Sequence, residues 1–191
     1  MSDIIKMTET STTNNNQDIA TLAGGCFWCI ESAFSQLQGI VSATSGYMGG
    51  TSKNPTYKEI CSGNSGHAEV VQLVFDSALI SYQEVLEIFF TLHDPTQLNR
   101  QGHDIGSQYR SAIFTHNKQQ DEIAHKVIKG MLIAQMFAQE IVTQVGPADT
   151  FYPGEDYHQG YFNNNPENQY CQAVVSPKLA KFRKTFVSKL K

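Results

Sequence analysis

Apolar residues recur along the chain with two spacings, one typical of strands and the other typical of helices. Short apolar runs predict strands over residues 19–23, 40–47, 68–75, 108–115 and 140–145. Helical spacing predicts helices over residues 26–37, 118–137 and, with a basic face, 177–191. A further helix is predicted to begin after Ser81, because Glu84 stands three residues later and completes a capping box, and to end at Asp94-Pro95.

Between residues 19 and 115 the predicted order is strand, helix, strand, strand, helix, strand. This βαββαβ order is typical of the ferredoxin-like split βαβ arrangement, an α+β two-layer sandwich with helices on one face of the sheet. A doubly wound parallel sheet is the competing arrangement. The two strands on either side of the loop at residues 49–66 favour antiparallel pairing, and therefore the ferredoxin-like fold.

The two ends of the chain differ from this regular middle. Residues 1–17 are polar and rich in Thr and Asn, so we expect a disordered tail, followed by a single domain over residues 18–191. The segment after Val145 is irregular, with turn signals at Pro153-Gly154 and Asn165-Pro166, and we expect this C-terminal extension to wrap the core. The Gly- and Ser-rich loop at residues 49–66 is longer than a structural connection needs, which favours a functional role.

Composition narrows the classes of function. The chain has 191 residues, 14 Lys and Arg against 18 Asp and Glu, and 40% hydrophobic residues, which is typical of a soluble, mildly acidic domain. This charge balance argues against a protein that binds nucleic acid or a membrane surface. No apolar run approaches the roughly 18 residues of a membrane span, and no signal core opens the chain, so we expect a cytoplasmic protein.

The most distinctive chemical group is Cys26, which follows two glycines and begins a predicted helix. Free backbone N–H groups and the helix dipole stabilise a thiolate at this position, so we expect a lowered thiol pKa. Two aromatic residues, Phe27 and Trp28, follow directly and could form an apolar wall beside a nucleophile; Trp28 is the only tryptophan of the chain. The alternative is an inert buried thiol next to ordinary core aromatics.

The other cysteines leave several interpretations open. Cys26 and Cys29 form a C-x-x-C pair, which in an intracellular protein indicates redox chemistry. A zinc site is disfavoured, because Cys61 and Cys171 stand alone and no second C-x-x-C exists. The four cysteines are also too few for a secreted disulfide scaffold. We therefore interpret them as thiols and expect no metal.

Glu69 begins a predicted strand in which alternation places it on the same face as Val71 and Leu73. A carboxylate buried there would have a raised pKa and could donate a proton at neutral pH. The alternative is a solvated carboxylate at the strand edge.

Four further polar residues are ambiguous from the sequence. Tyr57 and Tyr109 are either half-buried packing residues or phenolic hydrogen-bond donors inside a pocket. Asp104 and His158 lie in loop segments, where solvent exposure of the aspartate and a structural role of the histidine are the simpler interpretations.

Blocks of residues between Ile19 and Phe186 match one known family in order. They are Gly25-Cys26-Phe27-Trp28, Asn54-Pro55-Thr56-Tyr57, Gly66-His67-Ala68-Glu69-Val70, His93-Asp94-Pro95-Thr96-Gln97, Asp104, Ser107-Gln108-Tyr109-Arg110-Ser111, Glu155-Asp156-Tyr157-His158-Gln159 and Tyr170-Cys171. On these blocks the chain resembles the type A peptide methionine sulfoxide reductases, which reduce the S epimer of methionine sulfoxide and so repair oxidised proteins. The order of the blocks makes the resemblance specific.

The resemblance implies a role for each site residue. Cys26 is the implied nucleophile and Glu69 the implied proton donor to the sulfoxide oxygen, which also accepts hydrogen bonds from two tyrosines. The site residues implied to bind or support the substrate are Phe27, Trp28, Tyr57, Tyr109, Asp104 and His158. No metal, flavin or bound nicotinamide is implied, and the product on Cys26 is a sulfenic acid.

The resemblance also implies how the enzyme is recycled. A second thiol converts the sulfenic acid to an intramolecular disulfide, which thioredoxin then reduces. Cys171 is the implied resolving thiol, but Cys29 lies one helical turn from Cys26 and could compete. Free or protein-bound methionine sulfoxide is the implied substrate, and a monomer is the default expectation.

Two other classes of function stay open on the sequence alone. One is a general thiol-disulfide oxidoreductase that uses Cys26 and Cys29 on protein disulfides. The other is a non-catalytic module that binds oxidised methionine against Phe27 and Trp28 without consuming it.

Overall fold

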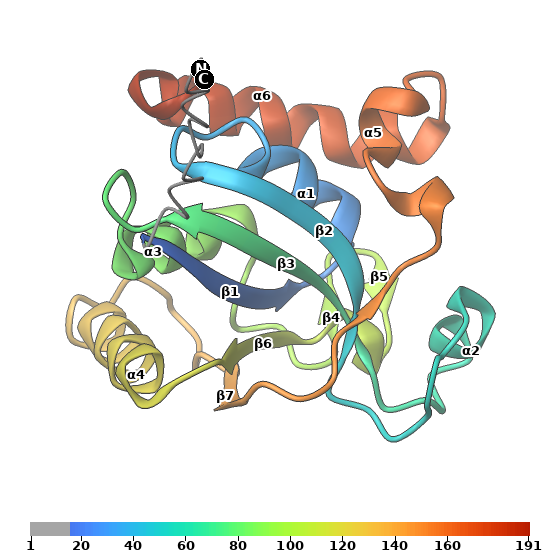
Figure 1. Cartoon of the computed structure of the whole chain (residues 1–191), viewed down its shortest axis with the longest axis horizontal. Helices are drawn as coiled ribbons and strands as arrows, with labels where there is room; N and C mark the ends of the chain where they lie inside the picture. Colours follow the sequence, from blue (N-terminus) through green and yellow to red (C-terminus); the bar gives the residue numbers. More distant parts are fainter. Residues whose placement is uncertain (1–15) are drawn as a thin grey trace, which may run out of the picture.

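A six-stranded mixed sheet forms the centre of the structure, which is a computed structural model that describes residues 16–191 (Figure 1). The strand order is β7-β6-β1-β3-β2-β8. The strands are β1 (Gln17–Gly24), β2 (Ile40–Met48), β3 (Ala68–Asp76), β6 (Ser111–Thr115), β7 (Gln144–Pro147) and β8 (Tyr152–Pro153). The β6–β7 pair is parallel and the other neighbours are antiparallel.

The predicted N-terminal tail can be compared with the structure only at its end. Residues 1–15 lie outside the described part of the chain. Gln17 already belongs to β1, where it pairs with Asp76, so the first strand begins one residue before the predicted domain boundary. The reason is that β3 extends to Asp76 and offers ladder partners to β1 from Gln17 to Leu22.

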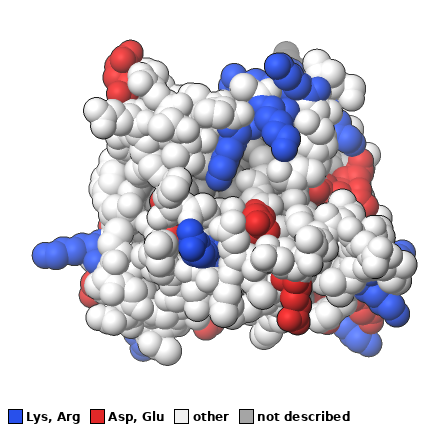
Figure 2. All heavy atoms as spheres, turned by 180° about the vertical axis from the view of Figure 1, so that it is seen from behind, with Lys and Arg blue, Asp and Glu red and all other residues white. Residues whose placement is uncertain are grey.

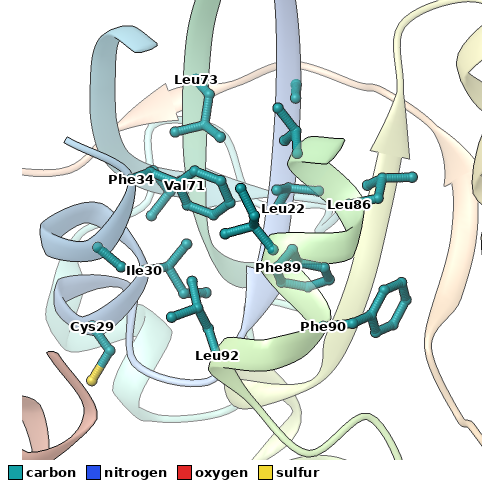
Figure 3. Close-up of a cluster of buried hydrophobic side chains, with 14 of the residues drawn as sticks. Leu22, Cys29, Ile30, Phe34, Val71, Leu73, Leu86, Phe89, Phe90 and Leu92 are labelled. Atoms are coloured by element: carbon teal, nitrogen blue, oxygen red, sulfur yellow. The ribbon is translucent and has the colours of Figure 1, made fainter. Parts of the chain in front are cut away.

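Four helices pack around one face of the sheet, and their apolar side chains fill the main core (Figure 3). They are α1 (Phe27–Phe34), α3 (Tyr82–Leu92), α4 (Lys118–Ile133) and α6 (Ser176–Thr185). The capping box at α3 forms as predicted, because the Ser81 hydroxyl accepts from the Glu84 N–H while the Glu84 carboxylate accepts from the Ser81 N–H. The helix α4 ends four residues before the predicted boundary, because Gln135 adopts a left-handed conformation with φ of 51°.

The opposite face of the sheet is also partly covered, so β3 is buried on both sides over its first four residues. Ala68 and Val70 belong to a second apolar cluster under Ala148 and Phe151, whereas Val71 faces the main core. The chain between β7 and β8 supplies this cover.

Two predicted loops contain unpredicted elements. Within residues 49–66 a short helix α2 (Tyr57–Cys61) forms, with a second capping box between Thr56 and Glu59. A small hairpin of β4 (Arg100–Gln101) and β5 (Asp104–Ile105) is followed by a 3₁₀ turn at Ser107–Tyr109. The predicted strand over 108–115 is therefore wrong at its start and begins at Ser111.

The C-terminal extension wraps the core as expected. It runs through β8, a 3₁₀ turn at Asp156–His158, α5 (Tyr161–Asn164) and a π-helical turn at Cys171–Val175 into α6. Figure 1 shows α6 lying beside α1. The predicted helix over 177–191 is shorter than expected, because a separate turn at Val187–Lys189 leads to a bridge between Leu190 and Leu37. No helix among residues 16–191 is long and apolar enough to cross a membrane.

Candidate active site

The Gly-Gly turn after β1 places Cys26 at the start of α1. Gly25 has φ of +88°, which favours glycine. A side chain at Gly24 would lie 2.8 Å from the Phe89 ring, so the turn can pack closely on α3 only without one. Cys26 is the N-cap of α1 and is 8% exposed.

A cavity of about 270 Å³ opens beside the Cys26 thiol. Its lining combines seven residues predicted for the site with two that were not predicted. These are Cys26, Phe27, Trp28, Tyr57, Glu69, Asp104 and Tyr109, together with Asn168 and Tyr170. The seven come from the sheet, α1, α2 and the segment around β5, which are far apart in sequence. The cavity is large enough for a small side chain, with aromatic rings on one part of its wall and hydrogen-bonding groups on another.

Glu69 is the buried acid of this cavity. It is 2% exposed, and its carboxylate accepts a hydrogen bond from the backbone N–H of Phe27 at 3.1 Å. Burial, followed by the nearby Cys26, raises its pKa well above the ordinary value of 4.5, although the Phe27 N–H lowers it in part. A carboxylic acid in this setting keeps its proton near neutral pH and can donate it.

The pKa of Cys26 differs from the sequence-based expectation. Burial raises it well above the ordinary value of 9.0, and the adjacent Cys29 thiol adds to this increase. The phenol of Tyr170 and the backbone N–H of Trp28 act in the opposite direction but do not compensate. The prediction of a lowered pKa was wrong, because desolvation of a thiolate in an enclosed cavity outweighs the helix N-terminus.

Three tyrosines face the cavity and remain protonated. Burial raises the pKa of Tyr57, Tyr109 and Tyr170, and nearby acidic groups raise it further. Tyr170 donates a hydrogen bond to Asp104 at 2.6 Å, which fixes this aspartate at the cavity wall. Phenols held in the O–H form can donate to an oxygen atom bound in the cavity.

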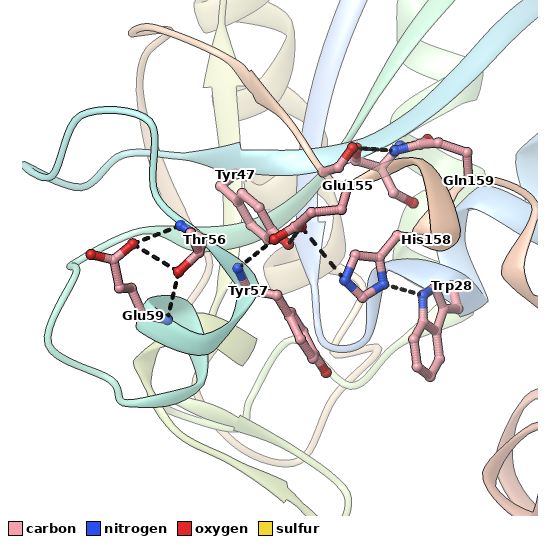
Figure 4. Close-up of polar contacts among 10 residues, drawn as sticks. Trp28, Tyr47, Thr56, Tyr57, Glu59, Glu155, His158 and Gln159 are labelled. Atoms are coloured by element: carbon pink, nitrogen blue, oxygen red, sulfur yellow. Dashed lines mark hydrogen bonds and ion pairs between the residues drawn. The ribbon is translucent and has the colours of Figure 1, made fainter.

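His158 does not line the cavity but lies behind its aromatic wall (Figure 4). The imidazole is fully buried, and its Nδ1 accepts a hydrogen bond from the Trp28 indole at 3.2 Å. Burial lowers its pKa, so the ring is neutral and Nε2 carries the proton. His158 is therefore placed to support Trp28 and not to contact a ligand.

The other thiols lie outside the cavity. Cys29 and Cys171 are buried in the same apolar cluster as Cys26, whereas Cys61 is exposed at the end of α2. The interaction with the Cys26 thiol, followed by the charge of Lys178, lowers the pKa of Cys29. Figure 3 shows the Cys29 side chain leaving α1 toward the C-terminal helical segment. Cys29 lies one helical turn from Cys26, and burial, followed by the nearby Cys26, raises the pKa of Cys171.

A larger groove of about 860 Å³ lies elsewhere, between α3, residues 136–139 and α6. Lys178 and Lys181 line it, and Figure 2 shows basic side chains gathered above a hollow on the face opposite that of Figure 1. Its lining contains no cysteine and shares no residue with the smaller cavity. The smaller cavity, which contains the Cys26 thiol, is therefore the candidate active site. Among residues 16–191 no group of three or more His, Cys, Asp or Glu could hold a metal ion.

Some residues of the site were missed from the sequence. Tyr170 stands directly before Cys171 in a matched block, and Glu155 begins another, so adjacency to a known site residue was the available signal. Asn168 carried no such signal. Its side chain accepts the backbone N–H groups of Tyr170 and Cys171 and so shapes the turn that brings Tyr170 to the cavity.

The model of one protein family, described as peptide methionine sulfoxide reductase, matches residues 18–190. The chain belongs to this family. It is similar to the peptide methionine sulfoxide reductase MsrA of Pasteurella multocida, with 53% identity over 87% of this chain and 95% of that protein. As a peptide methionine sulfoxide reductase it is an oxidoreductase that reduces methionine sulfoxide.

Solved structures of the peptide methionine sulfoxide reductase family have the same mixed α/β fold with a central mixed sheet. The reduced form of Mxr1 from Saccharomyces cerevisiae is 33% identical, with a TM-score of 0.77 over 82% of this chain and 90% of that one. Mxr1 in complex with Trx2 is 24% identical, with a TM-score of 0.55 over 80% of this chain and 90% of that one. The second similarity bears on the fold alone.

Proposed function

We propose that the protein reduces methionine-S-sulfoxide with Cys26 as the nucleophile and Glu69 as the proton donor. One observation carries this proposal: a single cavity of side-chain size contains the thiol, a buried carboxylic acid, three phenols and an aromatic wall. The methyl group of the substrate would lie against Phe27 and Trp28. The sulfoxide oxygen would accept hydrogen bonds from Glu69, Tyr57 and Tyr109.

In the proposed reaction the Cys26 sulfur attacks the sulfoxide sulfur and supplies two electrons to it. Glu69 protonates the oxygen, so that the oxygen can leave sulfur as a hydroxyl group. The products are methionine and a sulfenic acid on Cys26, and together they contain all the atoms of the thiol and the sulfoxide. The S–O bond of the substrate breaks as the hydroxyl group is transferred to the Cys26 sulfur, and the thiol proton replaces the proton that Glu69 donated.

The sulfenic acid would then react with a second thiol to give a disulfide and water. Cys171 is the proposed resolving thiol, and Cys29 is the alternative. Both are buried near Cys26, and neither touches the substrate cavity. Mapping the disulfide after one turnover without reductant distinguishes a Cys26–Cys171 bridge from a Cys26–Cys29 bridge.

We propose thioredoxin as the physiological reductant. A protein dithiol reduces such a disulfide by exchange, which regenerates both thiols. The existence of an Mxr1 structure in complex with Trx2 is consistent with this partner class, although that complex belongs to another protein. The cycle needs no metal, flavin or bound nicotinamide, because the thiols supply both electrons. A monomeric state and a cytoplasmic location stay predictions from the sequence.

We also infer that strands β6-β1-β3-β2 form the ferredoxin-like core predicted from the sequence, within one domain over residues 18–191. The strand order and the antiparallel pairing of these four strands support this description. The edge strands β7 and β8 would then be additions to the core.

The experiment that tests the proposed function measures consumption of each sulfoxide epimer with dithiothreitol as reductant. We expect consumption of the S epimer alone. Reduction of neither epimer would contradict the enzymatic role, and reduction of the R epimer would contradict the proposed stereochemistry.

A further inference from the structure

Glu155 joins three parts of the chain around the cavity without lining it (Figure 4). Its Oε1 accepts the backbone N–H of Tyr57, the first residue of α2, at 2.8 Å. Its Oε2 accepts the phenolic O–H of Tyr47 on β2, also at 2.8 Å. The same oxygen lies 3.7 Å from Nε2 of His158. A single carboxylate therefore fixes the start of α2 against the sheet and faces the buried histidine.

His158 lies between Glu155 and the Trp28 indole of the cavity wall. Its Nδ1 is occupied by the Trp28 indole, so the Nε2–H points toward Glu155 and has no closer acceptor among the described residues. The imidazole also packs edge-on against Tyr57, with 4.4 Å between ring centroids, and lies 5.0 Å from the Phe27 ring. His158 thus contacts three aromatic residues that line the cavity.

We propose that Glu155 is a positioning residue that, together with His158, holds Tyr57 and Trp28 in their places on the cavity wall. This inference rests on the proposed function, in which Tyr57 hydrogen-bonds to the sulfoxide oxygen and Trp28 bounds the methyl pocket. Glu155 acts on Tyr57 through its backbone N–H and on Trp28 through His158. One carboxylate thereby positions both a polar and an apolar residue of the substrate site.

The physical basis is the loss that follows removal of this acceptor. Without Glu155, the Tyr57 N–H and the Tyr47 O–H lose their shared acceptor, and the His158 Nε2–H loses the carboxylate oxygen that faces it at 3.7 Å. The start of α2 and the imidazole are then free to shift. A displacement of about 1 Å in a reacting group can lower a rate by about 10²-fold.

The test compares three variants in steady-state reduction of methionine-S-sulfoxide with dithiothreitol. Glu155→Ala should lower kcat/KM by about 10- to 100-fold. Glu155→Gln should lower it less, because its amide oxygen can still accept from one of the partners. The matched control is Asp156→Asn, the neighbouring exposed carboxylate, whose side chain makes no hydrogen bond within residues 16–191, and its kcat/KM should equal that of the wild type.

A second measurement separates positioning from general stability. Trp28 is the only tryptophan, so its fluorescence reports the cavity wall without any turnover. Acrylamide quenching of Trp28 should increase in folded Glu155→Ala and, to a smaller extent, in Glu155→Gln, but not in Asp156→Asn. In a Tyr57→Phe background, the loss of kcat/KM caused by Glu155→Ala should shrink at least threefold, because both changes remove the same interaction.

Wild-type quenching and kcat/KM in folded Glu155→Ala would overturn the proposal. If Glu155→Ala lowers kcat/KM by the same factor with and without Tyr57→Phe, the proposal that Glu155 positions Tyr57 is overturned. If Glu155→Ala does not fold, wild-type values in Glu155→Gln overturn the proposal in its place. A wild-type enzyme that fails to reduce the sulfoxide would contradict the proposed function, whereas the quenching comparison would still test whether Glu155 supports the wall.

Discussion

The substrate cavity is built from two regions of the chain that are held in place differently. The region from β1 to β6 carries the thiol, the acid and the tyrosines proposed to contact the sulfoxide oxygen, and seven of the eight residues of α1 are buried. The C-terminal extension carries Asn168, Tyr170 and the supporting pair Glu155 and His158, and none of the residues of α5 is buried.

The attachments of the two regions differ in kind. β1 is held by continuous ladders to both β3 and β6. Much of the extension before α6 is held by separate side-chain contacts. The Gln159 amide, for example, hydrogen-bonds to both the N–H and the C=O of Ser45, and the Glu31 carboxylate accepts the Gly160 N–H. The groups proposed to reduce the sulfoxide therefore lie on the region that the sheet supports, while the extension closes the cavity and carries the proposed resolving thiol Cys171. Changes in the first region should abolish chemistry, and changes in the second should reduce it.

The largest expected effect is that of Cys26→Ser. It removes the nucleophile from the first region and should lower turnover with dithiothreitol by more than about 10³-fold. Consumption of methionine sulfoxide measured by chromatography checks this. Cys61→Ser is the matched control, because Cys61 is exposed and outside the cavity, and it should retain activity. Substantial activity in Cys26→Ser would remove Cys26 from its role.

Glu69→Gln should come next, with a single-turnover rate lower by about 10²- to 10⁴-fold and an unchanged fold. The pKa of Glu69 is raised by burial, so the acid form is present at low and neutral pH and is lost as the pH rises through this pKa. The wild-type rate should fall on that alkaline side, and Glu69→Gln should lack this limb. Equal single-turnover rates of the two proteins near neutral pH would exclude Glu69 as the proton donor.

Phe182→Ala tests how the extension is anchored, since Phe182 is 3% exposed in the main core. We expect a loss of about 3–5 kcal/mol in the free energy of unfolding, from lost burial and the cavity that remains. Urea denaturation measures it. Val187→Ala, at a residue that is 71% exposed, should change stability by less than about 0.5 kcal/mol. Equal free energies of unfolding for Phe182→Ala and Val187→Ala would show that the contacts of α6 contribute little to holding the extension.

The smallest effect is expected for Tyr170→Phe, which removes the hydrogen bond to Asp104 and the phenol that interacts with the Cys26 thiol. A loss of about 1–2 kcal/mol corresponds to a decrease of roughly 5- to 30-fold in kcat/KM. Tyr157→Phe is the control, because Tyr157 is exposed and does not line the cavity, and it should behave as the wild type. A decrease as large as that of Glu69→Gln would mean that the extension takes part in the reduction of the sulfoxide, and not only in the later formation of the disulfide.

Local sequence signals located many of the elements of the fold. The capping box at Ser81 predicted the start of α3, and the apolar run at residues 68–75 predicted β3, because both depend on neighbours within a few residues. The same signal is present at Thr56 and Glu59, where a capping box begins the unpredicted helix α2. The predicted start of β6 is wrong, because the turn after Gly106, whose φ is +144°, depends on the neighbouring hairpin.

The sequence by itself determined which residues carry reactive groups: a thiol at a helix start, a carboxylate in an apolar strand and an aromatic pair beside the thiol. The tertiary structure decided the pKa values of these groups and which other residues they contact. The pKa of Cys26 is raised, because distant segments enclose it and exclude water. His158 supports Trp28 instead of lining the cavity, and Glu155 links three segments, since such contacts arise only when residues about 100 positions apart are packed together.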